Sequence, residues 1–164
     1  MKYLMLLMLV LASCKKQINN KDNPEETATE EVVDCGYAPG DYACNFTLFD
    51  HKSNKVSLYD YKGKTILLDF STMWCYYCNV AAMKEVELVN MYKDSDFEWI
   101  TVLVENKNGQ QPSGNDLKSW VEDYNLESPV LSGSKIGMLD FENDEIDTGF
   151  RCIGFPTFVI INKN

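Results

Sequence analysis

The chain of 164 residues has room for one globular domain and a modest additional segment. Hydrophobic residues make up 45% of it, which is enough to bury an ordinary core and excludes a wholly disordered chain. The formal net charge of −10 argues against nucleic acid and anionic lipid headgroups as main partners, because both carry the same sign of charge as the protein.

The N-terminal stretch has the pattern of an export signal. A basic Lys2 precedes the apolar run Leu4–Leu11, which is too short to cross a bilayer permanently but is typical of a signal-peptide core. Two small residues and Cys14 follow, and this junction resembles the lipobox of bacterial lipoproteins. Residues 1–13 are therefore predicted to be a signal peptide, and Cys14 a lipid anchor that attaches the protein to a membrane. An ordinary signal peptide, cut near Ser13, is the alternative.

The segment after the anchor is predicted to be a tether. Residues 14–33 carry almost no large apolar side chains and are rich in Lys, Glu, Asn and Thr. Such a segment cannot bury enough surface to offset its ordering entropy, so it is expected to be flexible. Residues 34–164 then form the folded domain. Under either form of the signal peptide, this domain lies outside the cytoplasm, in the periplasm or cell envelope.

The first part of the domain predicts two short strands and a buried one. Phe46–Asp50 and Lys55–Leu58 are expected to be strands on either side of a turn-forming stretch. The compact apolar run Thr65–Phe70 is typical of a buried central strand. A helix is expected to begin near Cys75, because apolar residues recur behind it at helical spacing.

The second part of the domain continues the alternation of strands and helices. The expected elements are a strand at Glu98–Val104, a helix that starts at Asn115 or Asp116 and stops before Pro129, a strand at Val130–Leu131 and a strand at Thr157–Ile161. Strands that alternate with helices predict an α/β fold, with a central mixed β-sheet flanked by helices.

Six cysteines are distributed over the chain, and export permits some of them to form disulfides. Cys35 and Cys44 are predicted to close a short, turn-rich loop as a structural disulfide. The rival pairing joins Cys44 to Cys152, if the early strand runs close to the loop before Pro156. Without that pairing, Cys152 is expected to be a buried structural thiol.

Cys75 and Cys78 are separated by two residues at the expected start of a helix, a spacing that suits redox chemistry. The helix N-terminus favours a thiolate at the first cysteine, and the second lies one turn later, within reach of a disulfide. The same spacing supplies half of a zinc site. Zinc is not expected here, because His51 is the only histidine and no second close pair of cysteines exists. Neither a metal nor another cofactor is predicted.

Several motifs together resemble the thioredoxin superfamily. They are Asp69-Phe70, Trp74-Cys75 with Cys78, and far downstream Gly154-Phe155-Pro156-Thr157. The resemblance implies that Cys75 is the nucleophile, that Cys78 resolves the mixed disulfide, and that Asp69 is a buried acid that moves protons to and from Cys78. It also implies a cis Pro156 beside the disulfide.

The same resemblance implies a substrate-binding surface around the cysteines. The backbone of Phe155 is expected to contact an extended substrate next to Pro156. From their position beside the cysteines, Trp74, Tyr76 and Tyr77 are expected to form a partly exposed apolar collar, with simple packing as the alternative, and Trp74 and Tyr76 are expected to contact the substrate.

The TlpA-like, AhpC/TSA-type branch of this superfamily matches the wider pattern. Its opening is similar to residues 40–48 and 56–64, and its helix–strand insert to residues 115–131. Three features depart from it: Tyr76-Tyr77 stands where a proline usually precedes the second cysteine, Cys44 replaces a proline, and no closing strand and helix follow residue 161. The domain is therefore expected to have an incomplete C-terminus, with β-strand 157–161 left as an edge.

The expected function is thiol–disulfide exchange on protein disulfides outside the cytoplasm, by a monomer that receives electrons from an upstream donor. The resemblance favours a reductase over an oxidase or isomerase, although the Tyr76-Tyr77 dipeptide leaves the direction of electron flow open. One alternative is a thiol peroxidase, since Thr72 lies three residues before Cys75, but Leu68 stands where that motif has proline. The other alternative is a non-enzymatic copper-delivery lipoprotein, which uses a wider cysteine spacing and a distant histidine.

Overall fold

The computed structural model describes residues 34–133, 149, 150, 152 and 154–163. The predicted signal peptide, Cys14 and the predicted tether lie outside these residues. Among the described residues, no helix combines the length and the apolar character needed to cross a bilayer.

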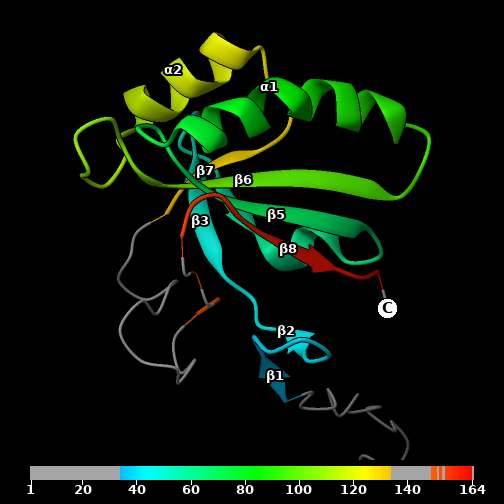
Figure 1. Cartoon of the computed structure of the whole chain (residues 1–164). Coiled ribbons are helices and arrows are strands. Elements are labelled where there is room, and N and C mark those ends of the chain that lie inside the picture. The colour runs from blue at the N-terminus through cyan, green and yellow to red at the C-terminus, as the bar shows by residue number, and fades with distance from the viewer. Residues whose placement is uncertain (1–33, 134–148, 151, 153, 164) are drawn as a thin grey trace, which may run out of the picture. The chain divides into compact units, whose positions relative to one another are not determined.

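A six-stranded mixed sheet forms the centre of the described domain (Figure 1). Its order is β4-β3-β7-β6-β5-β8. The central strands β5, β6 and β7 are parallel to one another, whereas β3, β4 and β8 each pair antiparallel with a neighbour. The bounds are Thr47–Asp50 for β3, Lys55–Ser57 for β4, Thr65–Thr72 for β5, Phe97–Glu105 for β6, Val130–Ser132 for β7 and Thr157–Ile161 for β8.

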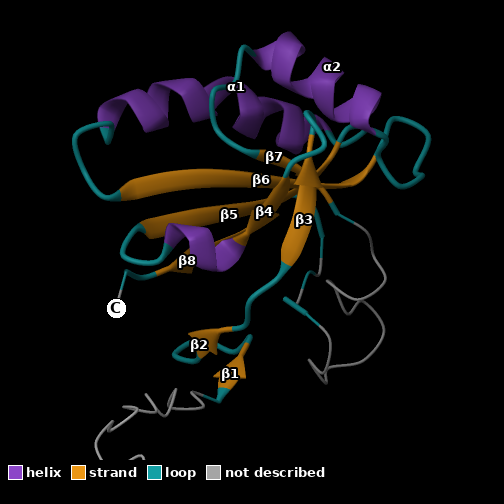
Figure 2. Cartoon of the chain, turned by 180° about the vertical axis from the view of Figure 1, so that it is seen from behind, coloured by secondary structure: helices purple, strands orange, loops and turns teal. Residues whose placement is uncertain are grey.

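Two helices, α1 (Tyr76–Met91) and α2 (Gly114–Tyr124), cover one face of this sheet (Figures 1 and 2). Helix α2 begins slightly before the predicted start, because Ser113 and Asp116 form a capping box that satisfies the free N–H groups of its first turn. It ends at Asn125, whose left-handed conformation (φ 53°) is one that asparagine tolerates well.

Alternation along β5 and β6 sends side chains to two different environments. On the face away from the helices, the buried core includes Ile66, Leu68, Phe70, Ile100, Val102 and Val104. On the helix face, Leu103 packs with Cys78 and Ala82 of α1. Because strand side chains alternate with a period of two, Asp69, Ser71 and Thr101 also point toward α1. Polar side chains thus lie between the sheet and the redox helix.

Most predicted elements are present, with shifted boundaries. Strand β5 extends past Phe70 to Thr72, with an irregularity in its pairing at Ser71/Thr72. Leu58 was expected to end a strand but begins the 3-10 helix η1 (Leu58–Tyr61), because the capping box of Ser57 and Asp60 starts a helical turn there. Strand β8 is an edge strand in the described sheet.

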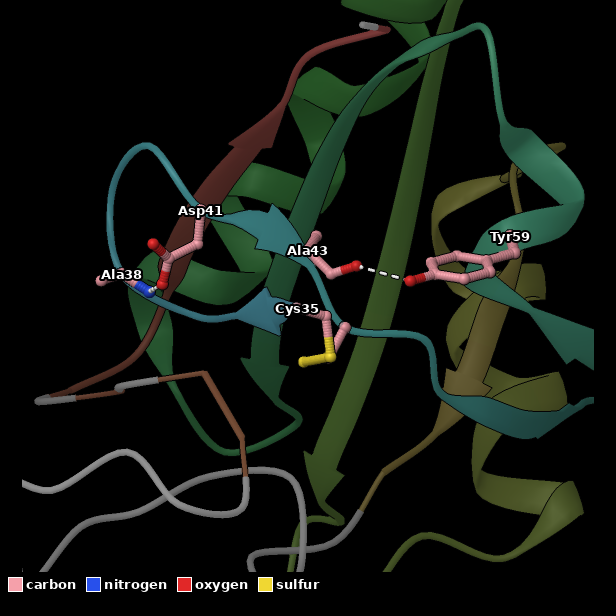
Figure 3. Close-up of a disulfide and its surroundings, with 6 residues drawn as sticks. Cys35, Ala38, Asp41, Ala43 and Tyr59 are labelled. Atoms are coloured by element: carbon pink, nitrogen blue, oxygen red, sulfur yellow. Dashed lines mark hydrogen bonds between the residues drawn. A yellow bond between two sulfur atoms is a disulfide. The ribbon is translucent and has the colours of Figure 1, made fainter. Parts of the chain in front are cut away.

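A small parallel pair of strands, β1 (Cys35–Gly36) and β2 (Tyr42–Ala43), was not predicted. A disulfide between Cys35 and Cys44 joins its ends, with a Cα–Cα distance of 4.8 Å (Figure 3). This is the expected pairing, and the rival partner Cys152 is a free, buried thiol.

Side-chain hydrogen bonds order the loop that this disulfide closes. Inside the loop, the carboxylate of Asp41 accepts from the backbone N–H of Ala38 at 3.0 Å. The hydroxyl of Tyr59 donates to the carbonyl of Ala43 at 3.1 Å (Figure 3). This hydrogen bond connects the loop to the 3-10 helix η1 that follows β4. The disulfide therefore secures a segment with little regular structure of its own.

Replacing both Cys35 and Cys44 by serine is expected to lower the free energy of unfolding by about 2.7 kcal/mol, because the unfolded chain regains the entropy of a short open loop. Urea unfolding of the two proteins measures the difference. The Cys152→Ser variant is the control, because it replaces a cysteine that forms no disulfide. A loss below about 0.5 kcal/mol would mean that the Tyr59 and Asp41 hydrogen bonds hold the loop without the disulfide.

Candidate active site

The two cysteines of the Cys75-x-x-Cys78 motif lie at the first turn of α1. Cys75 is the N-cap residue, with extended backbone angles (φ −80°, ψ 120°), and the N–H of Cys78 donates to its sulfur at 3.2 Å. Both thiols are free in the structure. Cys75 keeps 7% of its surface exposed and Cys78 none, so an incoming disulfide can meet Cys75 first.

The ends of β5 and β6 fix the loop that carries Cys75. Beyond β5, the N–H of Met73 donates to the carbonyl of Glu105 at 3.0 Å, and the N–H of Cys75 donates to the carbonyl of Thr72 at 3.3 Å. Parallel strands end together at one edge of a sheet, which is where ligand and catalytic sites form in such folds. The Cys75 sulfur is therefore held at a defined position above the sheet edge.

The segment before β8 lies directly against Cys75. The Phe155–Pro156 peptide bond is cis, as the resemblance implied. The thiol of Cys75 donates to the carbonyl of Phe155 at 3.4 Å, and the rings of Trp74 and Phe155 meet edge to face with centroids 6.2 Å apart. Residues separated by about half of the chain therefore form one surface.

Three aromatic side chains adjacent to Cys75 in the sequence are largely exposed. Trp74, Tyr76 and Tyr77 expose 53%, 74% and 70% of their surfaces. Trp74 is nevertheless fixed, since its indole N–H donates to Oε2 of the buried Glu105 at 2.7 Å. Large exposed aromatic side chains are typical of protein-binding surfaces.

Ser71 interacts with both Asp69 and Cys78. The hydroxyl of Ser71 donates to Oδ1 of Asp69 at 2.7 Å. Burial raises the pKa of Asp69 to about 7, against hydrogen bonds from Ser71 and Trp99 that lower it. Burial also raises the pKa of Cys78 to about 12, and Ser71 is among the groups that lower it. Ser71 therefore connects the predicted acid to the predicted resolving thiol.

Helix α2 supports the redox turn from the side. The amide of Asn79 donates to the carbonyl of Cys75 at 2.5 Å, and the hydroxyl of Tyr124 on α2 donates to the carbonyl oxygen of the Asn79 side chain. The inserted helix is thus linked through one side chain to the backbone of the nucleophilic position.

The structure brings together Cys75, Cys78, Asp69, Trp74, Phe155 and Pro156, all of which the sequence selected, and leaves Tyr76 exposed on their rim. Sequence reasoning missed Ser71, Glu105 and Asn79, whose roles depend on contacts across the sheet and between helices. It also missed Glu85, although a carboxylate on the apolar face of a helix was a visible signal. No group of side chains placed to hold a metal ion occurs among the described residues.

This fold is that of a thioredoxin-like protein. A solved structure of the thioredoxin domain of a thiol–disulfide oxidoreductase from Bacteroides vulgatus superposes with a TM-score of 0.57 at 21% identity, covering 78% of this chain and 84% of that one. The sequence model of the AhpC/TSA family matches residues 39–164, and the chain belongs to that family.

Several proteins that are similar in sequence carry the name thiol–disulfide oxidoreductase. The thiol–disulfide oxidoreductase ResA of Bacillus thuringiensis subsp. konkukian (strain 97-27) is 29% identical over 125 residues, which cover 76% of this chain and 64% of ResA. The chain thus matches less than two thirds of that relative's length. The pneumococcal exposed lipoprotein thioredoxin from Streptococcus pneumoniae strain TIGR4 is 27% identical, with a TM-score of 0.51 and coverage of 73% of this chain and 82% of that one.

Asp69→Asn is expected to stabilise the protein above neutral pH. The folded state holds a proton on Asp69 up to about pH 7, whereas the unfolded chain releases it near the ordinary pKa of 3.8, so the free energy of unfolding falls as pH rises between these values. Removing the carboxyl should therefore raise the free energy of unfolding at pH 8 by roughly 2–4 kcal/mol and change little at pH 4.

Urea unfolding across this pH range measures the effect. The control is Asp94→Asn, which removes an exposed carboxylate beyond α1 and should leave the pH dependence as it is. A variant that is less stable than the wild type at pH 8 would show that the folded state prefers an ionised Asp69.

Proposed function

We propose that this protein is an extracytoplasmic thiol–disulfide oxidoreductase that reduces protein disulfides, with Cys75 as the nucleophile and Cys78 as the resolving thiol. One observation carries the proposal. The Cys75 sulfur lies at the N-terminus of α1, between the N–H of Cys78 at 3.2 Å and the carbonyl of Phe155 at 3.4 Å, and exposed aromatic side chains flank Cys75 in the sequence.

The first half of the reaction uses the helix terminus. The free N–H groups and dipole of α1 favour negative charge at Cys75, and the N–H of Cys78 already points at its sulfur. The Cys75 thiolate attacks one sulfur of a substrate disulfide. A bond forms between Cys75 and that sulfur, and the other substrate sulfur leaves as a thiolate.

The second half uses Cys78, Ser71 and Asp69. The proton of the Cys78 thiol passes to Ser71, whose own proton passes to the carboxylate of Asp69 along the 2.7 Å hydrogen bond. The Cys78 thiolate then attacks Cys75, forms the Cys75–Cys78 disulfide and releases the second substrate thiolate. The substrate disulfide gains two electrons and the protein dithiol loses two, so an upstream donor must reduce the protein again.

The proposed substrate-binding surface consists of Trp74, Tyr76, Phe155 and Pro156. The carbonyl of Phe155 faces Cys75 at 3.4 Å, and Pro156 follows it without an N–H to donate. An extended polypeptide can lie along this segment, with its apolar side chains against Trp74 and Tyr76. This arrangement suits unfolded or loosely folded protein substrates more than small disulfides.

Two observations support a location outside the cytoplasm. The Cys35–Cys44 disulfide belongs to an oxidising compartment. The similar pneumococcal protein is an exposed lipoprotein, which agrees with the lipobox-like junction at Cys14. On this proposal residues 1–13 are removed, Cys14 carries lipid, and residues 14–33 separate the domain from the membrane.

Cys78→Ser is expected to trap a mixed disulfide between Cys75 and a protein substrate, because the resolving thiolate is absent. Insulin, incubated with the reduced variant and analysed by non-reducing electrophoresis and peptide mass, provides the measurement. Cys75→Ser should lower the rate of insulin reduction by a factor on the order of 10³ and form no such adduct.

Cys152→Ser is the matched control, since it removes the remaining free thiol of the domain and should keep insulin reduction near the wild-type rate. An adduct that forms through Cys78 in the Cys75→Ser variant would reverse the assigned roles. Turnover of hydrogen peroxide faster than of insulin would favour the peroxidase alternative instead.

Cys14→Ala is expected to abolish lipid attachment and move the protein from the membrane fraction to the soluble extracytoplasmic fraction, since a few acyl chains supply the anchoring free energy. Metabolic labelling with a fatty-acid analogue, followed by fractionation, tests this in bacterial cells. A labelled Cys14→Ala protein would place the anchor elsewhere.

A further inference from the structure

Glu85 is a buried carboxyl group that the proposed reaction does not use. It lies on α1, two turns beyond Cys78, and only 1% of its surface is exposed. Its Oε2 accepts a hydrogen bond from the hydroxyl of Thr101 at 3.2 Å, while its Oε1 is buried without a hydrogen-bond partner among the described residues. A fully buried, half-satisfied carboxyl is costly, so a purely structural account of this side chain is weak.

A short hydrogen-bonded path leads from Glu85 to the predicted acid Asp69. Thr101 lies directly opposite Asp69 in the pairing of β5 with β6. The indole N–H of Trp99 donates to the Thr101 hydroxyl at 3.1 Å and also lies close enough to Asp69 to lower its pKa. The path continues from Asp69 through Ser71 to Cys78.

The two carboxyl groups repel each other when both are ionised. Burial and, to a smaller extent, the charge of Asp69 raise the pKa of Glu85 to about 7, against hydrogen bonds from Ser128 and Thr101 that lower it. Apart from the charge of Asp69, the side chains that shift the pKa values of the two acids are neutral: Ser71 and Trp99 for Asp69, and Ser128 and Thr101 for Glu85. No lysine, arginine or histidine forms an ion pair with either acid in the described part of the chain.

We propose that Glu85 is a positioning residue of the redox site that shares one proton with Asp69 and thereby sets the pH range over which Asp69 is ionised and able to accept the Cys78 proton. This inference rests on the proposed function. Because two adjacent buried acids without a cation resist a second negative charge, the pair carries one proton before the resolving step.

The proton balance of the resolving step follows from this state. Glu85 is protonated and Asp69 ionised when the Cys75–substrate disulfide is in place. The Cys78 proton moves through Ser71 to Asp69, which becomes neutral, and the Cys78 thiolate attacks Cys75. The substrate thiolate that leaves takes up a proton from water, and Asp69 releases its proton when Cys78 is next protonated.

The test is the titration of the Asp69 side chain by carboxyl ¹³C NMR in the reduced protein. Glu85→Gln keeps the shape and the hydrogen bond to Thr101 but removes the second acid. We expect the titration midpoint of Asp69 to fall by about one pH unit in this variant. Glu87→Gln, an exposed α1 carboxyl paired with Lys84, is the control and should leave the midpoint in place.

Reciprocity distinguishes a charge interaction from a structural disturbance. In Asp69→Asn, the titration midpoint of Glu85 should fall by the same amount as that of Asp69 in Glu85→Gln, because the interaction energy is shared by both groups. In kinetics, the pH profile of mixed-disulfide resolution should shift to lower pH by a similar amount in Glu85→Gln. A residue that only fills space would not move this profile.

An unchanged Asp69 midpoint in Glu85→Gln, or unequal shifts in the two variants, would overturn the proposal. If Glu85→Gln does not fold, the test is the titration midpoint of Glu85 in the Asp69→Asn variant. A midpoint unchanged from the wild type would then overturn the proposal. The NMR measurement needs no turnover, so it can succeed even if the proposed function is wrong. If the titrations of Asp69 and Glu85 are coupled but the trapping experiment yields no Cys75 adduct, the proposed function is rejected and the inference about the acid pair stands.

Discussion

The interface between α1 and the helix-facing side of β5 and β6 is the contact on which the site depends. It places the helix N-terminus over the ends of two parallel strands and so fixes Cys75 above Thr72 and beside Phe155. The same packing removes Cys78 from water and closes the sheet face over Asp69. One packed interface thus creates both an accessible thiol and a buried proton acceptor.

Such an interface carries a cost in stability. An ordinary helix–sheet contact would place apolar side chains at Asp69, Ser71 and Glu85, where this chain has groups that hydrogen bonds only partly satisfy. The surrounding core compensates, since Leu103, Ala82 and the opposite sheet face are fully packed. Partly satisfied polar groups concentrated at one place in an otherwise apolar interface are typical of functional sites, where activity requires groups that lower the stability of the fold.

The sequence was sufficient to predict the α/β class, the main strands and the helix behind Cys75, because these depend on local apolar patterns. It was also sufficient to select Asp69 and Pro156, because a resemblance supplied their spacing. It did not predict the β1–β2 pair, which is too short to show a pattern. Glu105 and Glu85 act through partners 16 or more residues away, which are not visible before the chain is folded. Ser71 acts between Asp69 and Cys78, and that role depends on how α1 packs on β5.

The two pairs of cysteines show how environment, more than spacing, separates a structural bridge from a reactive one. Cys35 and Cys44 join the ends of a loop whose hydrogen bonds come from Tyr59 and Asp41, and neither cysteine lies at the start of a helix. Cys75 and Cys78 share a helix turn, where one thiol meets N–H groups and the other is kept from ionising by burial. A bridge that only restrains the chain needs a closed loop. A bridge that must form and break needs two thiols of unequal acidity and a group nearby that takes up the proton.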